Sequence, residues 1–147
     1  AQAGDHIICA SALYGGTYNL YAHTIRKMGV EATFVDPDCT PEELEAAFQD
    51  NTKAVFGESI ANPALVVLDF EKFAEAAHRH GVPFIVDNTF ATPINCRPFE
   101  WGAETLTGKL TAINSRDLQH RMRHTTESCI QRNSEKEPIL QRRQRSS

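Results

Sequence analysis

An aspartate follows directly on a short apolar run in the middle of the chain. Phe84-Ile85-Val86 is typical of a buried strand, and Asp87 then precedes Asn88-Thr89, where a surface turn would need no acid. Ligands of parallel sheets bind beyond the carboxyl ends of the strands, which is where this carboxylate is expected. There it could keep the pyridine nitrogen of pyridoxal phosphate (PLP) protonated, and the positive ring would act as an electron sink. A helix cap or a solvent-facing turn aspartate is the alternative.

Two more polar side chains follow predicted strands. Tyr14 stands in a glycine-flanked turn, where its ring could lie against a flat cofactor and its hydroxyl could face the substrate. Asn62 precedes Pro63, which favours an extended backbone, and its amide could donate to a phenolate oxygen of the cofactor. The alternatives are a core tyrosine that covers the sheet edge and an ordinary turn asparagine.

The elements that must position these side chains alternate between strand and helix. Apolar runs predict strands at residues 6–10, 31–35, 53–57 and 84–86. Segments of helical period separate the runs, which is the pattern of βαβ units. The sequence therefore predicts an α/β fold with a mainly parallel sheet.

Three helices have recognisable starts or ends. The first follows Gly15 and Gly16 and should place these residues on one face: Tyr18, Tyr21, Ile25 and Met28. The second begins at Thr40-Pro41-Glu42-Glu43, which combines a cap, a first-turn proline and a capping box. Asp69 is expected to cap the third, and Gly81 to end it.

The charge is unevenly distributed along the 147 residues. Residues 1–104 hold 6 Lys and Arg against 15 Asp and Glu, whereas residues 105–147 hold 9 against 4. The second part has little apolar periodicity, so we expect a folded part over 1–104 and a divergent, basic, disordered tail over 105–147. Its arginines lie among Gln, Ser and Asn without an aromatic residue to stack on a base, which argues against nucleic-acid binding.

Several other classes of site find little support. The cysteines form no CxxC pair and are expected to be reduced structural thiols: Cys9, Cys39, Cys96 and Cys129. His78 and His80 are two apart on a predicted helix and cannot share a face, so no metal site is expected. Gly15-Gly16 is not a GxGxxG fingerprint. No apolar run is long enough to span a bilayer, and the expected location is the cytoplasm.

Three segments resemble, in their order and spacing, those of the trans-sulfuration family of fold-type-I PLP enzymes: ALYGGTYNL, ESIANPALVVLD and VPFIVDNTFATP. The similarity covers about residues 1–103 and is strongest to the O-acetylhomoserine sulfhydrylase branch, judged by residues 15–20, 60–63 and 95–103. It implies that the chain contains a partial PLP-binding large domain.

The resemblance also implies roles for five residues. Tyr14 would stack on the PLP ring and assist protonation of the leaving group, and Asp87 would pair with the pyridine nitrogen. Asn62 matches the asparagine near the phenolic oxygen of the cofactor. Glu58 matches an acid that supports this network, and Thr89 matches the threonine that follows the pyridine-binding aspartate.

The activity implied is γ-replacement on an amino acid. Acetate would leave O-acetylhomoserine, and sulfide or a thiol would add to give homocysteine or a relative. Family members are homo-oligomers. Cystathionine γ-synthase or γ-lyase activity, or a non-catalytic Rossmann-like binding or interaction module, are alternatives.

The chain departs from the family pattern at the lysine that carries PLP. The family has Ser-x-Thr-Lys after its tryptophan-glycine-alanine and a following strand, and family spacing puts the lysine at Ala112. Lys109 stands three residues early and lacks the flanking Ser and Thr, so it is not assigned the Schiff-base role. The sequence therefore predicts an incomplete or inactive fragment of such an enzyme.

Overall fold

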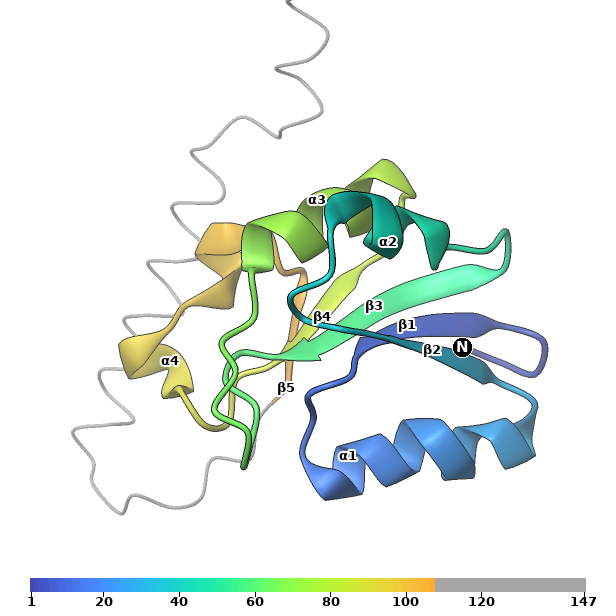
Figure 1. Cartoon of the computed structure of the whole chain (residues 1–147), viewed down its shortest axis with the longest axis horizontal. Coiled ribbons are helices and arrows are strands. Elements are labelled where there is room, and N and C mark those ends of the chain that lie inside the picture. Colours follow the sequence, from blue (N-terminus) through green and yellow to red (C-terminus); the bar gives the residue numbers. More distant parts are fainter. Residues whose placement is uncertain (108–147) are drawn as a thin grey trace, which may run out of the picture. The chain divides into compact units, whose positions relative to one another are not determined.

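The computed structural model describes residues 1–107 of the chain. One sheet of five parallel strands runs in the order β2-β1-β3-β4-β5 (Figure 1). The strands are β1 (His6–Ala10), β2 (Glu31–Val35), β3 (Thr52–Glu58), β4 (Phe84–Asp87) and β5 (Thr105–Thr107). The parallel α/β fold expected from the sequence is confirmed, and β1 and β2 have the predicted bounds.

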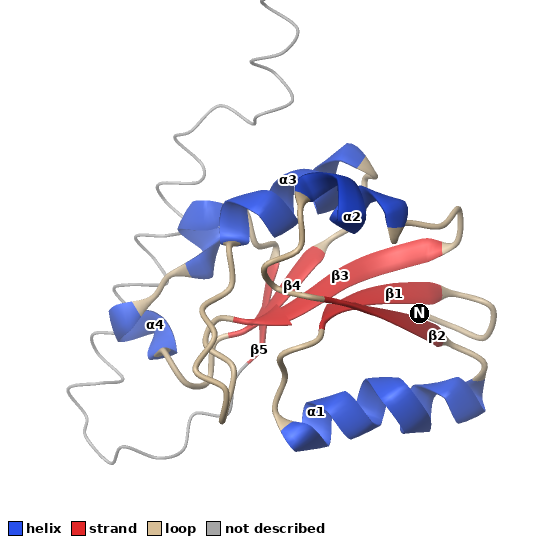
Figure 2. Ribbon diagram, viewed as in Figure 1, coloured by secondary structure: helices blue, strands red, loops and turns tan. Residues whose placement is uncertain are grey.

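Helices cover both faces of this sheet (Figure 2). One face carries α1 (Gly15–Asn19), continued by the helical turns η1 (Leu20–Thr24) and η2 (Ile25–Met28). The opposite face carries α2 (Pro41–Ala46) and α3 (Phe70–Arg79). Two short elements, α4 (Thr92–Asn95) and η3 (Pro98–Trp101), lie in the connection from β4 to β5.

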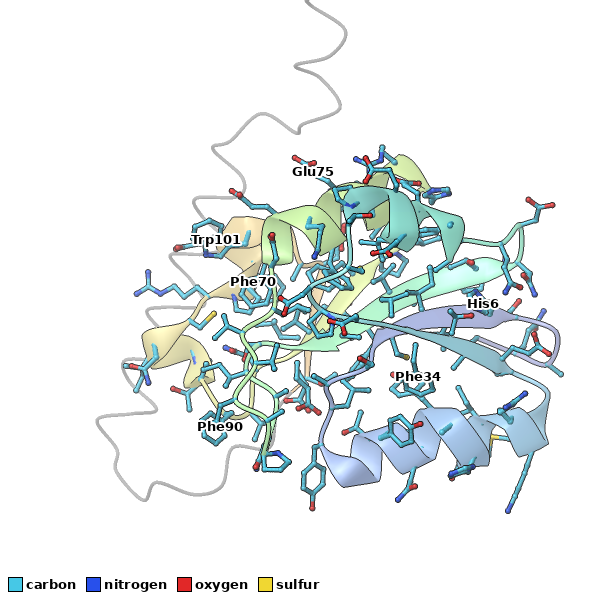
Figure 3. The ribbon with its side chains drawn as sticks, in the orientation of Figure 1. His6, Phe34, Phe70, Glu75, Phe90 and Trp101 are labelled. Carbon is cyan, nitrogen blue, oxygen red and sulfur yellow. The ribbon has the colours of Figure 1, made fainter. Side chains whose placement is uncertain are left out.

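Alternate residues of the strands supply two hydrophobic clusters. The larger cluster lies under α2 and α3 and includes Ile8, Leu44, Val55, Phe73, Phe84 and Val86. The smaller one lies on the α1 face and consists of Cys9, Leu13 and Phe56 with half-buried neighbours such as Phe34. Phe34 points from β2 toward α1 in Figure 3. Because side chains alternate along a strand, Glu58 and Asp87 share the α1 face with Phe56 and Ile85.

The predicted helix boundaries at α2 and α3 are confirmed by their caps. The Thr40 hydroxyl accepts from the Glu43 N–H at 3.2 Å, and the Glu43 carboxylate accepts from the Thr40 N–H at 2.8 Å. Asp69 Oδ1 accepts from the Lys72 N–H at 3.1 Å. Gly81 follows α3 with φ of +67°, a left-handed conformation that glycine adopts readily.

The helix after Gly16 differs from the regular amphipathic helix predicted. It changes from α-helical to a π turn over η1 and to a 3-10 turn over η2. A π turn holds more residues than an α turn, so it rotates the face that the 3.6-residue period would bury. Tyr21 is half-buried against Phe56, whereas Met28 is 67% exposed.

The sheet also continues past residue 104, where the sequence suggested that the basic tail begins. β5 spans Thr105–Thr107 and pairs with β4 over three residues. Its sequence, Thr-Leu-Thr, is too short and polar to be identified from apolar periodicity. The strand is instead stabilised by its pairing with β4. Residues 108–147, including the rest of the predicted tail, lie outside the described residues.

His6 is a fully buried imidazole at the start of β1. Its Nδ1 hydrogen-bonds the Thr52 hydroxyl and its Nε2 the Thr33 hydroxyl, both at 2.8 Å. Burial lowers the pKa of His6 below its ordinary value of 6.5, partly opposed by the charge of Glu31. The unfolded chain therefore takes up this proton more readily than the folded chain does.

This difference predicts acid sensitivity. The contribution of His6 to the free energy of unfolding is fully present above about pH 6.5 and is lost as the pH falls toward the lower folded pKa. Urea unfolding of wild type and His6→Gln at several pH values should show a steeper acid loss in wild type. The exposed His23→Gln is the control, and equal slopes for wild type and His6→Gln would contradict the prediction.

Gly57 lies in β3 where its Cα approaches Leu68 closely. A Cβ at this position would collide with Cδ2 of Leu68, a buried side chain. Gly57→Ala should therefore lower the free energy of unfolding by about 1–3 kcal/mol, as overpacked cores do. Gly15→Ala is the control in urea unfolding. Its Cβ would meet nothing within 4 Å, so this variant should not lower the free energy of unfolding. Equal stability of the two variants would show that Leu68 moves aside freely.

Candidate active site at the carboxyl end of the sheet

Glu58 is a buried carboxylate at the end of β3, with 7% of its surface exposed. Its Oε1 accepts from the Tyr14 N–H at 2.8 Å. It also hydrogen-bonds the backbone of Asn62 and the side chain of Thr17. Tyr14 is the N-cap residue of α1 and makes no side-chain cap, so Glu58 supplies an acceptor at this helix start. One acid thus ties the turn before α1 to the loop after β3.

The surroundings of Glu58 raise the pKa of its carboxyl above the ordinary value. Burial is the main cause that raises its pKa, and the charge of Asp87 adds to it. The hydrogen bonds from Tyr14, Asn62 and Thr17 act in the opposite direction. Two carboxylates on adjacent strands of the same face repel one another, and a positive group bound between them would relieve this repulsion.

Asp87 is the last residue of β4 and is paired in register with Glu58. Its Oδ1 accepts from the backbone N–H of Thr89 at 2.8 Å and from the Thr89 hydroxyl at 2.5 Å. Within residues 1–107, Oδ2 of Asp87 receives no hydrogen bond. Among the described residues, the carboxylate is therefore held through one oxygen, and its other oxygen has no donor.

Tyr14 presents its ring at the same edge, with 58% of its surface exposed. The ring lies beside Gly16 at the start of α1: a Cβ built on Gly16 would come within 2.9 Å of Cε1 of Tyr14. Because Gly16 has no side chain, the Tyr14 ring can occupy this space. An exposed aromatic face of this kind can stack on a planar ligand.

Asn62 lies in the loop after β3 and is exposed. This loop folds back on itself through the Ala61 N–H, which donates to the Val66 carbonyl at 2.9 Å, and through a bridge between Ile60 and Val67. The Asn62 backbone is joined to Glu58, so the amide is carried to the edge that bears Tyr14.

The five residues singled out in the sequence therefore form one chain of contacts. Glu58 joins Tyr14 and Asn62 directly, faces Asp87 in register, and Asp87 binds Thr89. This arrangement offers an aromatic face, an available carboxylate oxygen and an exposed amide on three neighbouring loops. Such a donor and acceptor set fits a flat heterocycle with a protonated ring nitrogen and a phenolic oxygen, as in PLP.

Sequence reasoning did not identify Thr17 or the contacts of Asn88. Thr17 is the third residue of α1, near the helix start, and that spacing from Tyr14 could have suggested a role at the cap. Asn88 is 4% exposed and donates to the Cys96 carbonyl at 2.9 Å. No local spacing rule predicts a bond of that kind.

The described part of the chain offers few other groups that could bind a metal or react. Residues 1–107 contain no cluster of three side chains suited to a metal ion. Cys9, Cys39 and Cys96 are free thiols whose pKa is raised by burial, to about 12 for Cys9. No helix in this range is long and apolar enough to cross a membrane. Cys129 lies outside it.

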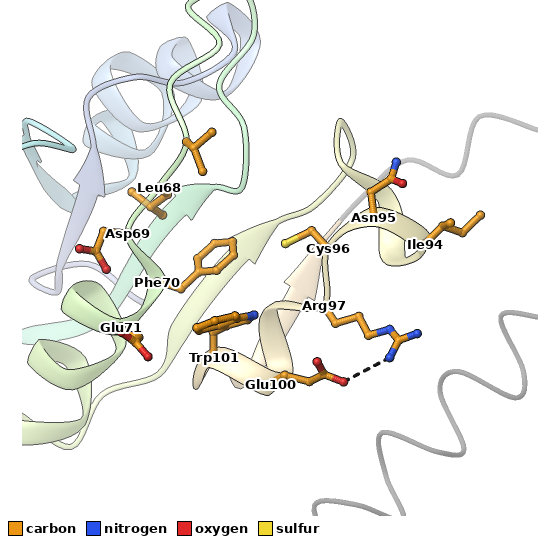
Figure 4. Close-up of a pocket in the computed structure, with 11 residues that line it drawn as sticks. Leu68, Asp69, Phe70, Glu71, Ile94, Asn95, Cys96, Arg97, Glu100 and Trp101 are labelled. Carbon is orange, nitrogen blue, oxygen red and sulfur yellow. Dashed lines mark hydrogen bonds and ion pairs between the residues drawn. The ribbon is translucent and has the colours of Figure 1, made fainter.

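A groove of about 560 Å³ lies elsewhere, between the start of α3 and the η3 segment (Figure 4). It is lined by apolar side chains such as Phe70 and Trp101, and by Arg97, whose guanidinium pairs with Glu100 at 3.3 Å. None of the five predicted site residues lines it. Its Asp69 already caps α3, and the groove contains none of the residues that meet at Glu58, so it is not the candidate site.

Residues 1–111 match the family model of Cys/Met metabolism PLP-dependent enzymes. The chain is 49% identical over 111 residues to O-acetyl-L-homoserine sulfhydrylase of Corynebacterium glutamicum, a match that covers 76% of this chain and 25% of that protein. It is 47% identical over 112 residues to homocysteine/cysteine synthase of Saccharomyces cerevisiae, with the same coverage. The chain thus spans about a quarter of the length of the curated relatives it matches.

A solved structure shows the same fold. The O-acetylhomoserine (thiol)-lyase of Campylobacter jejuni, which contains N'-pyridoxyl-lysine-5'-monophosphate, superimposes with a TM-score of 0.73 at 38% identity, over 76% of this chain and 27% of that one. The described sheet therefore corresponds to part of the large domain of a fold-type-I PLP enzyme. The site geometry, the family match and the shared fold agree: the chain belongs to the PLP-dependent enzymes of cysteine and methionine metabolism.

Proposed function

We propose that residues 1–107 hold the ring of PLP, and that the chain is an incomplete or inactive fragment of an enzyme that replaces the acetoxy group of O-acetylhomoserine with sulfide or a thiol and releases acetate. The observation that supports this most strongly is the convergence of Tyr14, Asn62 and Asp87 on Glu58 at one edge of the sheet. The relatives named for sulfhydrylase and homocysteine synthase activity support the choice of substrate.

Asp87 provides the charge in this proposal. When bound, PLP supplies a protonated pyridine ring that withdraws electrons from the α-carbon of the amino acid. Oδ2 of Asp87 would accept from the ring N–H and keep that proton in place. Thr89 holds Oδ1, so the carboxylate cannot turn away without breaking two hydrogen bonds.

Tyr14 and Asn62 orient the ring in its plane. The aromatic face of Tyr14 would stack on the heterocycle, and the Asn62 amide would donate to the phenolic oxygen. In a complete enzyme of the family, the Tyr14 hydroxyl would donate a proton to the departing acetate. Glu58 touches neither ring nor substrate and acts by holding the backbone of both residues.

The sequence of 147 residues binds PLP without a covalent link in this proposal. Ala112 stands where the family has its PLP-bearing lysine, and both Ala112 and Lys109 lie outside the described residues. Without that lysine, no side chain moves the proton at the α-carbon, and turnover by this chain alone is absent. A cytoplasmic enzyme is proposed because the described cysteines are free thiols, as in reducing compartments.

A PLP titration tests the central contact. Wild type should bind PLP in absorbance and calorimetric titrations, and Asp87→Asn should bind about 10- to 100-fold more weakly, because a hydrogen bond to a charged group is worth roughly 1.5–3 kcal/mol. Borohydride treatment should attach no pyridoxyl group to any lysine peptide.

The matched control is Asp50→Asn, an exposed aspartate just before β3 at the opposite end of the strand. It should leave PLP binding unchanged. Equal affinity of wild type and Asp87→Asn, or pyridoxyl labelling of Lys109, would contradict the proposal.

Glu58→Gln tests the buried acid through stability. The folded pKa of Glu58 lies above its ordinary value of 4.5, so its contribution to the free energy of unfolding is fully present below about pH 4.5 and is lost as the pH rises through the folded pKa. Glutamine has no proton to lose. The free energy of unfolding of Glu58→Gln relative to wild type should therefore rise as the pH increases from about 4.5 through the folded pKa of Glu58.

Urea unfolding at several pH values measures this difference. Glu75→Gln, at an exposed position of α3, is the control and should show no such rise. A relative stability of Glu58→Gln that falls with rising pH would mean that the fold favours ionised Glu58.

A further inference from the structure

Asn88 fastens both ends of α4 to the end of β4. Its backbone carbonyl accepts from the N–H of Thr92, the first residue of α4, at 2.9 Å. Its side-chain Nδ2 donates to the carbonyl of Cys96, the C-cap of α4, also at 2.9 Å. One buried residue therefore closes the segment 88–96 into a loop.

The peptide between Asp87 and Asn88 is also tied to both neighbouring strands. The Asp87 carbonyl accepts from the Ser59 N–H, next to β3, at 2.9 Å. The Asn88 N–H donates to the Thr107 carbonyl of β5, at 2.9 Å. With the strands fixed, the direction of the chain leaving Asp87 depends on the loop that Asn88 closes.

The loop includes a backbone conformation that needs such support. Thr92 has φ of +61°, a left-handed value that is unfavourable for a β-branched residue. Residues held in such regions persist only where their surroundings over-determine them, and they cluster at functional sites. The bond from the Thr92 N–H to Asn88 is one of these constraints.

The side chain of Asn88 is not the one that stability alone would favour. Its Oδ1 is buried and has no hydrogen-bond partner among the residues described. A buried acceptor without a partner lowers the stability of the fold. The useful part of this side chain is therefore its N–H donor, which binds the Cys96 carbonyl. An aspartate here would have no N–H to offer the Cys96 carbonyl, and alanine or serine would be too short to reach it.

We propose that Asn88 is a positioning residue for Asp87: by closing the segment 88–96 it keeps Thr89 on Oδ1 and directs Oδ2 at the open edge of the site. The inference rests on the proposed function, since it concerns the carboxylate that pairs with the ring nitrogen. Asn88 touches neither ring nor substrate, and its effect passes through Asp87.

Binding of two ligands can show whether Asn88 positions Asp87 or only stabilises the fold. PLP and its 1-deaza analogue, which has carbon in place of the ring nitrogen, are titrated against the full chain. Wild type should prefer PLP by at least about tenfold, because only PLP can donate to Asp87. Asn88→Leu, similar in size but without a donor, and Asn88→Ala should lose most of this preference, as Asp87→Asn does. Asn95→Ala, an exposed asparagine of α4, should keep it.

The outcomes distinguish the inference from the proposed function. If Asp87→Asn loses the preference while both Asn88 variants keep it, the positioning role is overturned and the proposed function stands. If wild type shows no preference, or Asp87→Asn keeps it, the proposed function fails and the inference fails with it. Equal weakening of both ligands in the Asn88 variants would show a merely structural role.

Wild-type NMR decides the matter if both variants fail to fold. The side-chain amide of Asn88 should give two slowly exchanging proton signals that shift when PLP binds and stay in place with the deaza analogue. Signals that exchange rapidly, or that respond equally to both ligands, would overturn the proposal.

Discussion

The candidate site depends on a buried carboxylate that does no chemistry itself. Glu58 is the last residue of β3 and accepts a hydrogen bond from the backbone N–H of Tyr14, which follows β1. Without it, the start of α1 would lack an acceptor and the loop of Asn62 would lose its anchor. Burial raises the pKa of this carboxyl, because an ionised acid in this position loses the stabilisation that water would give it. Functional sites commonly violate local rules of stability in this way, and the rest of the fold compensates.

Parallel pairing explains why three distant segments meet. The order β2-β1-β3-β4-β5 places β3 between β1 and β4, so the residues after β1, β3 and β4 emerge side by side at one edge. The register then puts Glu58, Asp87 and Thr107 in one row on the α1 face. The larger core under α2 and α3 stabilises this geometry from the opposite face. The candidate site residues thus share the α1 face with the smaller hydrophobic cluster, and the larger core lies on the opposite face.

Much of this was readable from sequence because local signals and global fold agree. Apolar runs such as Phe84–Val86 end at polar residues, and Thr40 to Glu43 carry a complete capping box, so strands and helix starts were correctly placed. The π turn at η1 was not predictable, since its extra residue leaves no mark in the composition. β5 was missed because three residues carry too little periodicity. Contacts between distant residues, such as Asn88 with Cys96, require the tertiary structure.

In the proposed function, Asp87 keeps the ring nitrogen of PLP protonated. This role is tested most directly by the ¹⁵N NMR signal of PLP labelled at that nitrogen, recorded at a pH where the unbound cofactor has lost its ring proton. Bound to this chain, the label should give the signal of a protonated ring, and Asp87→Asn should abolish it. A neutral ring signal in the wild-type complex would contradict the account.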